Sequence, residues 1–176
     1  MKLPRVLLAG LKGGSGKTIV SLGLARYFSK IGLRVKPYKK GPDYIDAVWL
    51  GRAAGTGATN VDPFFLYDRL LPILFLEKAK VADLALIEGN RGLFDGKDVS
   101  GSCSSAYLAR KLDTPVVLVI DCTKMSRTVA PLVQGCARFE PGLDLAGVIF
   151  NQTAGERHRR ILRNCVETYT DVPVLG

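Results

Sequence analysis

The sequence predicts a three-layer α/β domain in which a mostly parallel β-sheet is covered by helices on both faces. Apolar runs of strand length alternate with helical patterns along the chain, and this alternation is typical of βαβ units with right-handed crossovers. The apolar runs are nearly continuous rather than alternating with polar residues, as in strands that are buried on both sides. With 176 residues, the chain fits one domain over residues 1–176.

In the first half of the chain, three strands and one helix are expected. The strands are the apolar runs at 5–9, 34–37 and 84–87. The helix is expected over 17–31, because Gly32 then stands where glycine is favoured after a helix end. The side chains expected on its buried face, from their helical spacing, are Val20, Leu24, Tyr27 and Phe28.

The second half of the chain alternates in the same way. Strands are expected at 115–120 and 145–150, and a further strand begins in the run at 172–175. Helices are expected at 104–112, 129–139 and 156–169. Because the sequence stops as the last run begins, we expect the natural polypeptide to continue past residue 176.

Composition and charge argue against several kinds of partner. No apolar run approaches the ~20 residues of a membrane span, and no export signal is recognisable, so the cytoplasm is the expected location. The net charge of +9, with basic clusters at 34–40 and 157–163, favours an anionic partner. Neither cluster shows the interleaved stacking aromatics of a nucleic-acid-binding surface, so no nucleic acid is expected. One histidine and four cysteines without a CxxC pair form no recognisable zinc site.

The segment after the first expected strand reads GLKGGSGKT over residues 10–18 and opens the first helix. This is the context in which a P-loop binds the phosphates of ATP, through backbone N–H groups and the helix N-terminus. Lys17 would place its charge beside the β- and γ-phosphates, and the Thr18 hydroxyl would bind Mg²⁺. The residues expected to bind nucleotide here are Lys12, Gly13, Gly14, Ser15, Gly16, Lys17, Thr18 and Ile19. The alternative is a glycine-rich turn that binds no ligand.

The loop departs from the strict P-loop pattern. Leu11 stands where G-x-x-x-x-G-K-[ST] has its first glycine, and Lys12 follows it. With Lys12 the loop has the form K-G-G-x-G-K-T, which resembles the chromosome-partition and septum-positioning ATPases, where the extra lysine reaches a nucleotide across a dimer interface. Lys12 either has that role, which implies a homodimer, or neutralises phosphate charge locally.

Two further segments place carboxylates near expected strand ends. Glu88 follows the third strand, at the sheet edge where parallel folds bind ligands, and is a candidate Mg²⁺ ligand or water-positioning residue. Asp95, in the glycine-rich segment that follows, is a candidate γ-phosphate sensor. The segment KPYKKGPDYID over 36–46 sets Asp43 and Asp46 beside three lysines, and these groups can hold metal, carboxylates or phosphates. The alternatives are a simple strand-end carboxylate and a polar turn.

Seven segments occur in an order that resembles a known family. They read GLKGGSGKT, KPYKKGPDYID, NVDPF, IEGNRGLFDG, GSCSSAYLARKLDTPVVLVID, GVIFNQTAGERH and VPVLG. Together they resemble the ATP-binding domain of cobyrinate a,c-diamide synthase, a relative of dethiobiotin synthetase, over residues 8–176. The pair GPDYID and EGxxGLFDG is far more specific than a P-loop alone. A related enzyme that amidates a nickel tetrapyrrole has the same motifs.

The resemblance implies a P-loop NTPase fold and an amidation, dependent on ATP and Mg²⁺, of the a and c acetate side chains of an anionic tetrapyrrole. In that chemistry ATP phosphorylates a carboxylate, and ammonia then displaces phosphate from the acyl phosphate. Family members take ammonia from a C-terminal glutaminase domain, which no segment of this chain resembles. A glutaminase partner is therefore expected, either elsewhere in the same protein or in a separate chain.

The resemblance also implies roles for residues at matching positions. The implied catalytic residues are Lys17, Asp43, Asp46, Glu88 and Asp95, and the implied metal ligands are Thr18, Asp43 and Glu88. The implied substrate contacts are Lys36, Lys39, Lys40 and Tyr44. Asn151 would read adenine, and the loop that begins at Pro173 would flank the base.

Two other functions stay open at this point. A dimeric ATPase switch of the partition or metal-insertion kind is favoured by Lys12, whereas GPDYID and GLFDG favour the amidoligase. A carboxylase similar to dethiobiotin synthetase would use the same site on a different small acid.

Overall fold

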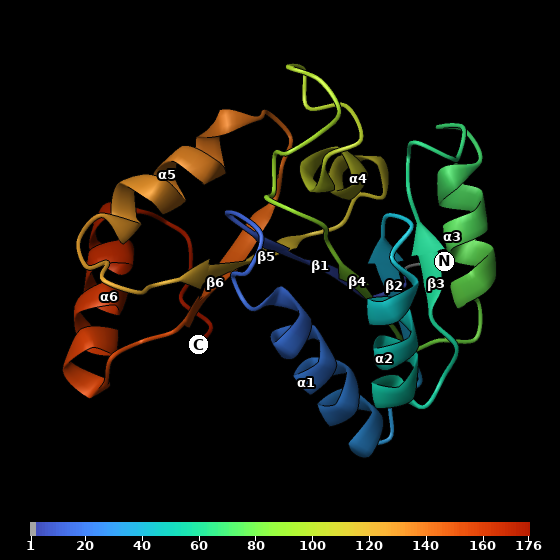
Figure 1. The fold of residues 1–176 in the computed structure, drawn as a ribbon, viewed down its shortest axis with the longest axis horizontal. Coiled ribbons are helices and arrows are strands. Elements are labelled where there is room, and N and C mark those ends of the chain that lie inside the picture. The colour runs from blue at the N-terminus through green and yellow to red at the C-terminus, as the bar shows by residue number, and fades with distance from the viewer. Residues whose placement is uncertain (1–2) are drawn as a thin grey trace.

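Six parallel strands form one sheet in the order β3-β2-β4-β1-β5-β6, as the computed structural model of residues 3–176 shows (Figure 1). The elements are β1 (Arg5–Gly10), α1 (Lys17–Lys30), β2 (Val35–Lys40), α2 (Tyr44–Ala54), β3 (Thr59–Val61), α3 (Leu71–Ala79), β4 (Leu84–Glu88), α4 (Ser105–Lys111), β5 (Val116–Asp121), α5 (Val129–Phe139), β6 (Leu145–Asn151) and α6 (Glu156–Tyr169). All strand pairs are parallel, so their carboxyl ends share one edge of the sheet. The predicted three-layer architecture is confirmed.

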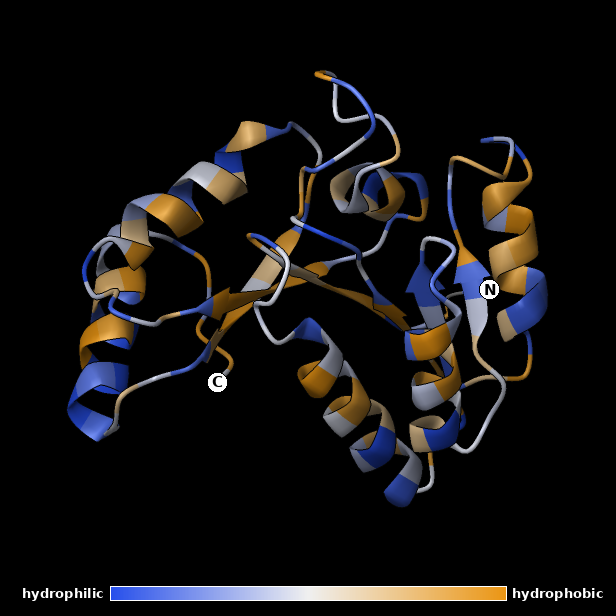
Figure 2. Ribbon diagram, viewed as in Figure 1, coloured by the Kyte–Doolittle hydropathy of each residue, from blue (hydrophilic) through white to orange (hydrophobic). Residues whose placement is uncertain are grey.

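Helices cover both faces of this sheet, and each face has its own core. On one face α1 and α2 contribute Ala25 and Ala54 to a small cluster with Leu8 and Leu86. On the other face α3, α4, α5 and α6 pack a larger cluster, with α6 lying against α5 at the β6 side of the molecule. Figure 2 shows that the central strands are largely hydrophobic along their length. This agrees with strands buried on both sides.

Most predicted elements are present, with bounds that differ by one or two residues at several ends. The helices at 129–139 and 156–169 match α5 and α6. The run at 172–175 forms only an isolated bridge, between Val174 and Val148 of β6, rather than a strand. Within α1, Tyr27 is 58 % exposed and does not join the buried face expected for it.

Three elements were not predicted, and the reason for each lies in its side chains. In α2 the buried positions are Ala47, Leu50 and Ala54, but the outward face is also apolar, so helical periodicity is hidden. In α3 nearly every residue is apolar, and the buried Leu71, Phe75 and Ala79 do not stand out from exposed neighbours. β3 has only three residues and carries no pattern.

The first turn of α2 lies in the segment that was expected to be a polar turn or a metal-binding loop. Asp43 is the N-cap residue, and its Oδ1 accepts the backbone N–H of Asp46 at 3.0 Å. Asn60 of β3 donates through Nδ2 to the carbonyl oxygens of Gly41, at 2.7 Å, and of Asp43, at 3.0 Å. These contacts hold the β2–α2 connection at the carboxyl edge of the sheet.

Among residues 3–176, no helix is both long enough and apolar enough to cross a bilayer.

Candidate active site

The connection between β1 and α1 forms an open, glycine-dependent loop at the carboxyl edge. Gly14 and Gly16 have positive φ angles of 77° and 92°, which L side chains adopt only with strain. A Cβ at Gly16 would also overlap the side-chain amide of Asn151. No acidic residue lies in the first turn of α1, and no side chain caps it. The first N–H groups of the helix are therefore available to an anion.

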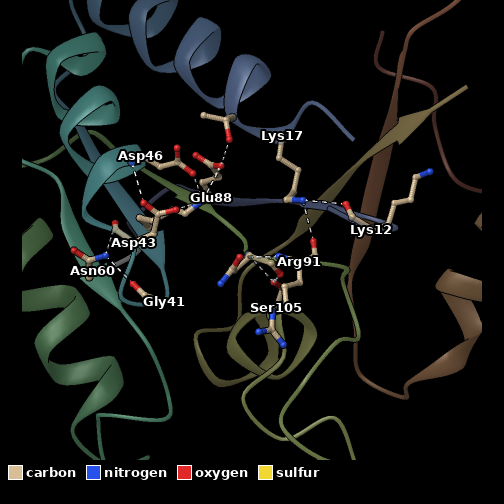
Figure 3. Close-up of polar contacts among 12 residues, drawn as sticks. Lys12, Lys17, Gly41, Asp43, Asp46, Asn60, Glu88, Arg91 and Ser105 are labelled. Carbon is tan, nitrogen blue, oxygen red and sulfur yellow. Dashed lines mark hydrogen bonds and ion pairs between the residues drawn. The ribbon is translucent and has the colours of Figure 1, made fainter. Parts of the chain in front are cut away.

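Lys17 is the only basic side chain of the loop that turns back over it. Its Nζ donates to the carbonyl oxygen of Lys12 at 3.2 Å and to that of Arg91 at 2.9 Å (Figure 3). Burial, and then the nearby charge of Lys39, lowers the pKa of Lys17. The Lys12 side chain is exposed and extends away from Lys17, as Figure 3 shows. The two lysines of the loop therefore face different surroundings.

A buried ionic network lies beside the loop, where β2 and β4 end. The sheet register pairs Lys39 with Glu88, and the Lys39 ammonium donates to Glu88 Oε1 at 2.9 Å. The same ammonium donates to Asp46 Oδ2 at 2.7 Å and lies 4.0 Å from Asp43 Oδ2. Burial opposes the charge of Lys39, but its hydrogen bond to Asp46 and the charge of Glu88 outweigh burial and raise its pKa. Lys39 therefore remains a cation among three carboxylates.

This network gives Lys39 partners inside the protein, whereas the resemblance implied a contact with substrate. Only 3 % of its surface is exposed, and its ammonium is already paired with Glu88 and Asp46. Lys36 lies at the opposite end of β2, where its Nζ donates to the carbonyl oxygen of Gly57 at 2.5 Å. The structure therefore does not bring Lys36 to the site. Tyr44, in the first turn of α2, is 74 % exposed.

Glu88 and Thr18 offer oxygen atoms suited to a Mg²⁺ ion. The Thr18 hydroxyl donates to Glu88 Oε1 at 2.6 Å, and Glu88 is fully buried. The second oxygen, Glu88 Oε2, is buried without a hydrogen-bond partner, which is costly unless a ligand satisfies it. Mg²⁺ is typically bound by one or two carboxylates together with substrate phosphates and water, so this pair fits the ion. Asp43 instead caps α2, and within residues 3–176 no three His, Cys, Asp or Glu side chains group closely enough to hold a metal unaided.

The segment after β4 is tied directly to the phosphate loop. Leu93 N–H donates to the Gly10 carbonyl at 2.7 Å, and Gly89 N–H donates to the Leu8 carbonyl at 2.8 Å. Asp95 turns back on its own segment, where its Oδ2 accepts the Gly92 N–H at 2.9 Å. With the Lys17–Arg91 contact, these bonds place residues 89–95 against the phosphate loop.

Asn151 and Pro173 occupy different levels of β6. Asn151 ends the strand and donates through Nδ2 to the carbonyl of Ser15 at 3.0 Å, so it contacts the phosphate loop. Pro173 accepts the Val148 N–H at 3.0 Å, three residues before the strand end, which is roughly 10 Å below that edge. Gly176 lies closer, because its carbonyl accepts the Phe150 N–H at 2.8 Å. Ile19 is 77 % exposed, so only its backbone faces the loop.

Sequence reasoning missed a cavity of about 250 Å³. It lies at the same carboxyl edge of the sheet, on the face opposite to Glu88. Lys40, Asp62, Phe64, Phe65, Arg91, Asp95 and Lys97 are among the residues that line it. The NVDPF segment at 60–64 contributes two of them, Asp62 and Phe64, but it has no chemistry of its own that would single it out in the sequence.

Comparison with known proteins places the chain in a family. Residues 6–176 match the family described as the CobQ/CobB/MinD/ParA nucleotide binding domain. The chain is 44 % identical to a cobyrinate a,c-diamide synthase of Magnetococcus marinus, over 99 % of this chain and 38 % of that protein. It is 44 % identical to that of Salmonella typhimurium over 97 % and 37 %. A hydrogenobyrinate a,c-diamide synthase of Streptomyces coelicolor is 42 % identical over 99 % and 36 %. The chain thus spans less than two fifths of the length of these relatives.

Solved structures show the same fold at low sequence identity. The signal recognition particle 54 kDa protein of Aeropyrum pernix, in complex with GDP, has a TM-score of 0.70 at 19 % identity, over 99 % of this chain and 41 % of that one. The hydrogenase maturation factor HypB of Archaeoglobus fulgidus has a TM-score of 0.64 at 17 % identity, over 98 % and 79 %.

Proposed function

The chain belongs to the CobQ/CobB/MinD/ParA nucleotide-binding domain family, and on that premise we propose that it is the ATP-binding domain of an amidoligase that acts on cobyrinate or a close corrinoid. The reaction would convert the a and c acetate carboxylates to amides. Identities of 41–44 % to cobyrinate a,c-diamide synthases across nearly the whole chain support this proposal. The chain covers less than two fifths of the length of these relatives, so the proposal for this domain concerns ATP-dependent activation of the carboxylate.

The observation that carries the proposal is the unpartnered oxygen of Glu88 beside the phosphate loop. A simple structural ion pair would satisfy both carboxylate oxygens, but Glu88 satisfies only Oε1, through Lys39 and Thr18. Bound Mg²⁺ would neutralise phosphate charge as the terminal phosphoryl group leaves. Glu88 Oε2 and the Thr18 hydroxyl are the oxygens that would hold it.

The protein groups divide the first step among them. The phosphate loop and Lys17 bind the β- and γ-phosphates, which stabilises the charge that develops on the leaving ADP. Lys39 holds Glu88 and Asp46 in fixed positions at 2.9 Å and 2.7 Å. A substrate carboxylate oxygen attacks the γ-phosphorus, the bond to the ADP oxygen breaks, and an acyl phosphate forms. Positioning of the two reactants supplies much of the rate enhancement in such transfers.

In the second step ammonia attacks the acyl carbon, and inorganic phosphate leaves as a proton is lost from nitrogen. The ammonia would come from glutamine, released by a glutaminase domain of the same protein or of a partner chain. In this scheme Asp95, hydrogen-bonded to Gly92 at 2.9 Å, couples the state of the γ-phosphate to the segment that follows β4. Asn151, held against Ser15, would contact the nucleoside.

The direct test is incubation of the full-length protein with ATP, Mg²⁺, ammonia and cobyrinate, followed by mass spectrometry. Two successive amidations, each accompanied by one ADP, are expected. Release of phosphate without any amidated product would contradict the proposal.

A dimeric ATPase switch is the second candidate, because the Lys12 side chain is exposed and directed away from its own loop. Light scattering with and without ATP separates the two functions. An ATP-dependent dimer that Lys12→Ala abolishes, together with absent amidation, would favour the switch.

A further inference from the structure

Lys40 is a largely buried residue that lines the cavity beside the proposed reaction site. Only 6 % of the residue is exposed. No hydrogen bond or ion pair engages its ammonium within residues 3–176, although neighbouring Lys39 has several. Burial lowers the pKa of Lys40, with the charge of Asp62 acting in the opposite sense. Partial burial strengthens the attraction between this unpaired ammonium and an anion that enters the cavity.

The strand geometry separates Lys40 from Lys39. Successive side chains of a strand point to opposite faces of the sheet. On β2, Val35 belongs to the core under α1 and α2, whereas Tyr38 belongs to the core on the other face. Lys39 therefore shares the face of Glu88, and Lys40 points to the opposite face. The two lysines serve two different sites.

The cavity that Lys40 lines carries both basic and exposed aromatic side chains. Three basic side chains, Lys40, Arg91 and Lys97, line it against two acidic ones. The acidic groups already accept backbone N–H groups, because Asp62 bonds to Phe64 and Asp95 bonds to Gly92, each at 2.9 Å.

Two aromatic rings of this cavity present their surfaces to solvent. Phe64 and Phe65 are 63 % and 65 % exposed and pack edge to face with centroids 5.0 Å apart. The Lys97 ammonium lies over the Phe64 ring, 5.8 Å from its centroid. Exposed rings beside basic side chains suit a ligand with an apolar body and a carboxylate side chain.

Arg91 joins this cavity to the phosphate loop. Its side chain lines the cavity, while its carbonyl oxygen accepts the Lys17 ammonium at 2.9 Å. A substrate bound in the cavity therefore lies one residue away from the group that holds the γ-phosphate.

We propose that this cavity is a subsite for a carboxylate of the substrate that does not react, and that Lys40 is the specificity-determining residue that pairs with it. The inference rests on the proposed function, because it assumes a substrate with several carboxylates. The carboxylate supplies the missing partner of Lys40, and Phe64 and Phe65 contact the apolar skeleton that carries it. The reacting carboxylate is then directed over the strand ends toward Lys17 and Glu88.

The test compares the full-length protein with its Lys40→Met variant, which keeps the length and apolar stem of the side chain. Lys36→Met is the matched control, since Lys36 lies on the same strand and face but at the other end. We expect Lys40→Met to raise the KM for cobyrinate about 10-fold to 100-fold, because the variant loses one charge-assisted hydrogen bond to the substrate. The value of kcat and the affinity for ATP should change little, and the control should resemble wild type.

A second arm changes the ligand instead of the protein. Cobyrinate derivatives with single non-reacting carboxylates esterified should include one that binds wild type about 10-fold more weakly while Lys40→Met does not discriminate against it. Binding measured by calorimetry, with a non-hydrolysable ATP analogue present, makes this arm independent of turnover. Equal affinity of Lys40→Met and wild type for cobyrinate would overturn the subsite alone. A wild-type protein that neither binds nor amidates cobyrinate would overturn the proposed function as well.

A structural role for Lys40 predicts a different result. Because the ammonium has no partner, Lys40→Met should raise the midpoint of thermal unfolding of the ligand-free protein. A lower midpoint would mean that Lys40 supports the fold, and Lys40→Gln, which retains a donor, would then have to reproduce the KM effect for the subsite to stand.

Discussion

Replacing Lys39 by methionine tests whether this lysine holds the site together or binds substrate. The change removes a cation that donates to Glu88 at 2.9 Å and to Asp46 at 2.7 Å. Glu88 is fully buried, so its charge would be left with only the Thr18 hydroxyl as a partner. Breaking a buried ion pair from one side costs about 3–5 kcal/mol, because an uncompensated charge stays behind. The lysine side chain is 4 % exposed, so solvent screening reduces this little.

The measurement is urea unfolding at pH 7, followed by circular dichroism, for wild type, Lys39→Met, Glu88→Gln and the double variant. A loss of about 3–5 kcal/mol in the free energy of unfolding would also lower the midpoint of thermal unfolding by about 6–20 °C for a domain of this length. The double variant should recover at least about 1–2 kcal/mol over the sum of the single changes, since it leaves no unpaired charge. The reasoning is refuted if Lys39→Met costs under about 1 kcal/mol and only weakens substrate binding. That outcome would restore Lys39 as a substrate contact.

Further outcomes follow from the site geometry. Lys17→Ala should reduce ATP affinity at least about 100-fold, because it removes the cation beside the β- and γ-phosphates; unchanged affinity in calorimetry would contradict this. Glu88→Gln should leave ATP bound but slow amidation about 100-fold to 1,000-fold, the size of effect seen when one transition-state contact is lost; a wild-type rate would contradict this. Asp43→Asn keeps an N-cap oxygen and should slow amidation much less; a loss as large as that of Glu88→Gln would assign Asp43 to the metal site. The difference in free energy of unfolding between wild type and Lys39→Met should have its full size below pH 10.5 and shrink as the pH rises further. The reason is that a lysine with a raised pKa stabilises the fold only while its amine is protonated. A difference that stays constant up to pH 12 would argue against the ion pair.

The sequence was sufficient for the central strands and for the phosphate loop, because both depend on local patterns. Continuous apolar runs identify β1, β4, β5 and β6, and the Gly-Lys-Thr context identifies the start of α1. Glu88 could be placed at the edge because it directly follows such a run. Long-range contacts such as Asn151 to Ser15 have no local signal, and the resemblance to a family implied only that Asn151 reads adenine.

The two helices that were missed share one physical cause, which is apolar surface that the fold leaves exposed. On α2, Ile45, Val48 and Trp49 are each more than half exposed, so the helix lacks the polar face that would reveal its period. On α3, Ile73 is 60 % exposed while Phe75 is buried. Hydrophobic periodicity in the sequence reveals a helix only when one face is polar, so it did not predict α2 and α3.

The end of β2 decides the roles of the two adjacent lysines. The sequence predicted that this strand ends at Pro37. That end would leave Lys39 and Lys40 in a loop, where both would be free to contact the same ligand. The strand in fact extends through Lys40, with Lys40 paired to Val61 and Lys39 to both Asn60 and Glu88. Alternation then sends one ammonium to the buried carboxylates and the other to the aromatic-lined cavity. Part of the net charge of +9 is therefore neutralised inside the protein by buried carboxylates. At this edge of the sheet, Lys40 and Arg91, rather than all the lysines of 36–40, carry the charge that faces an anionic substrate.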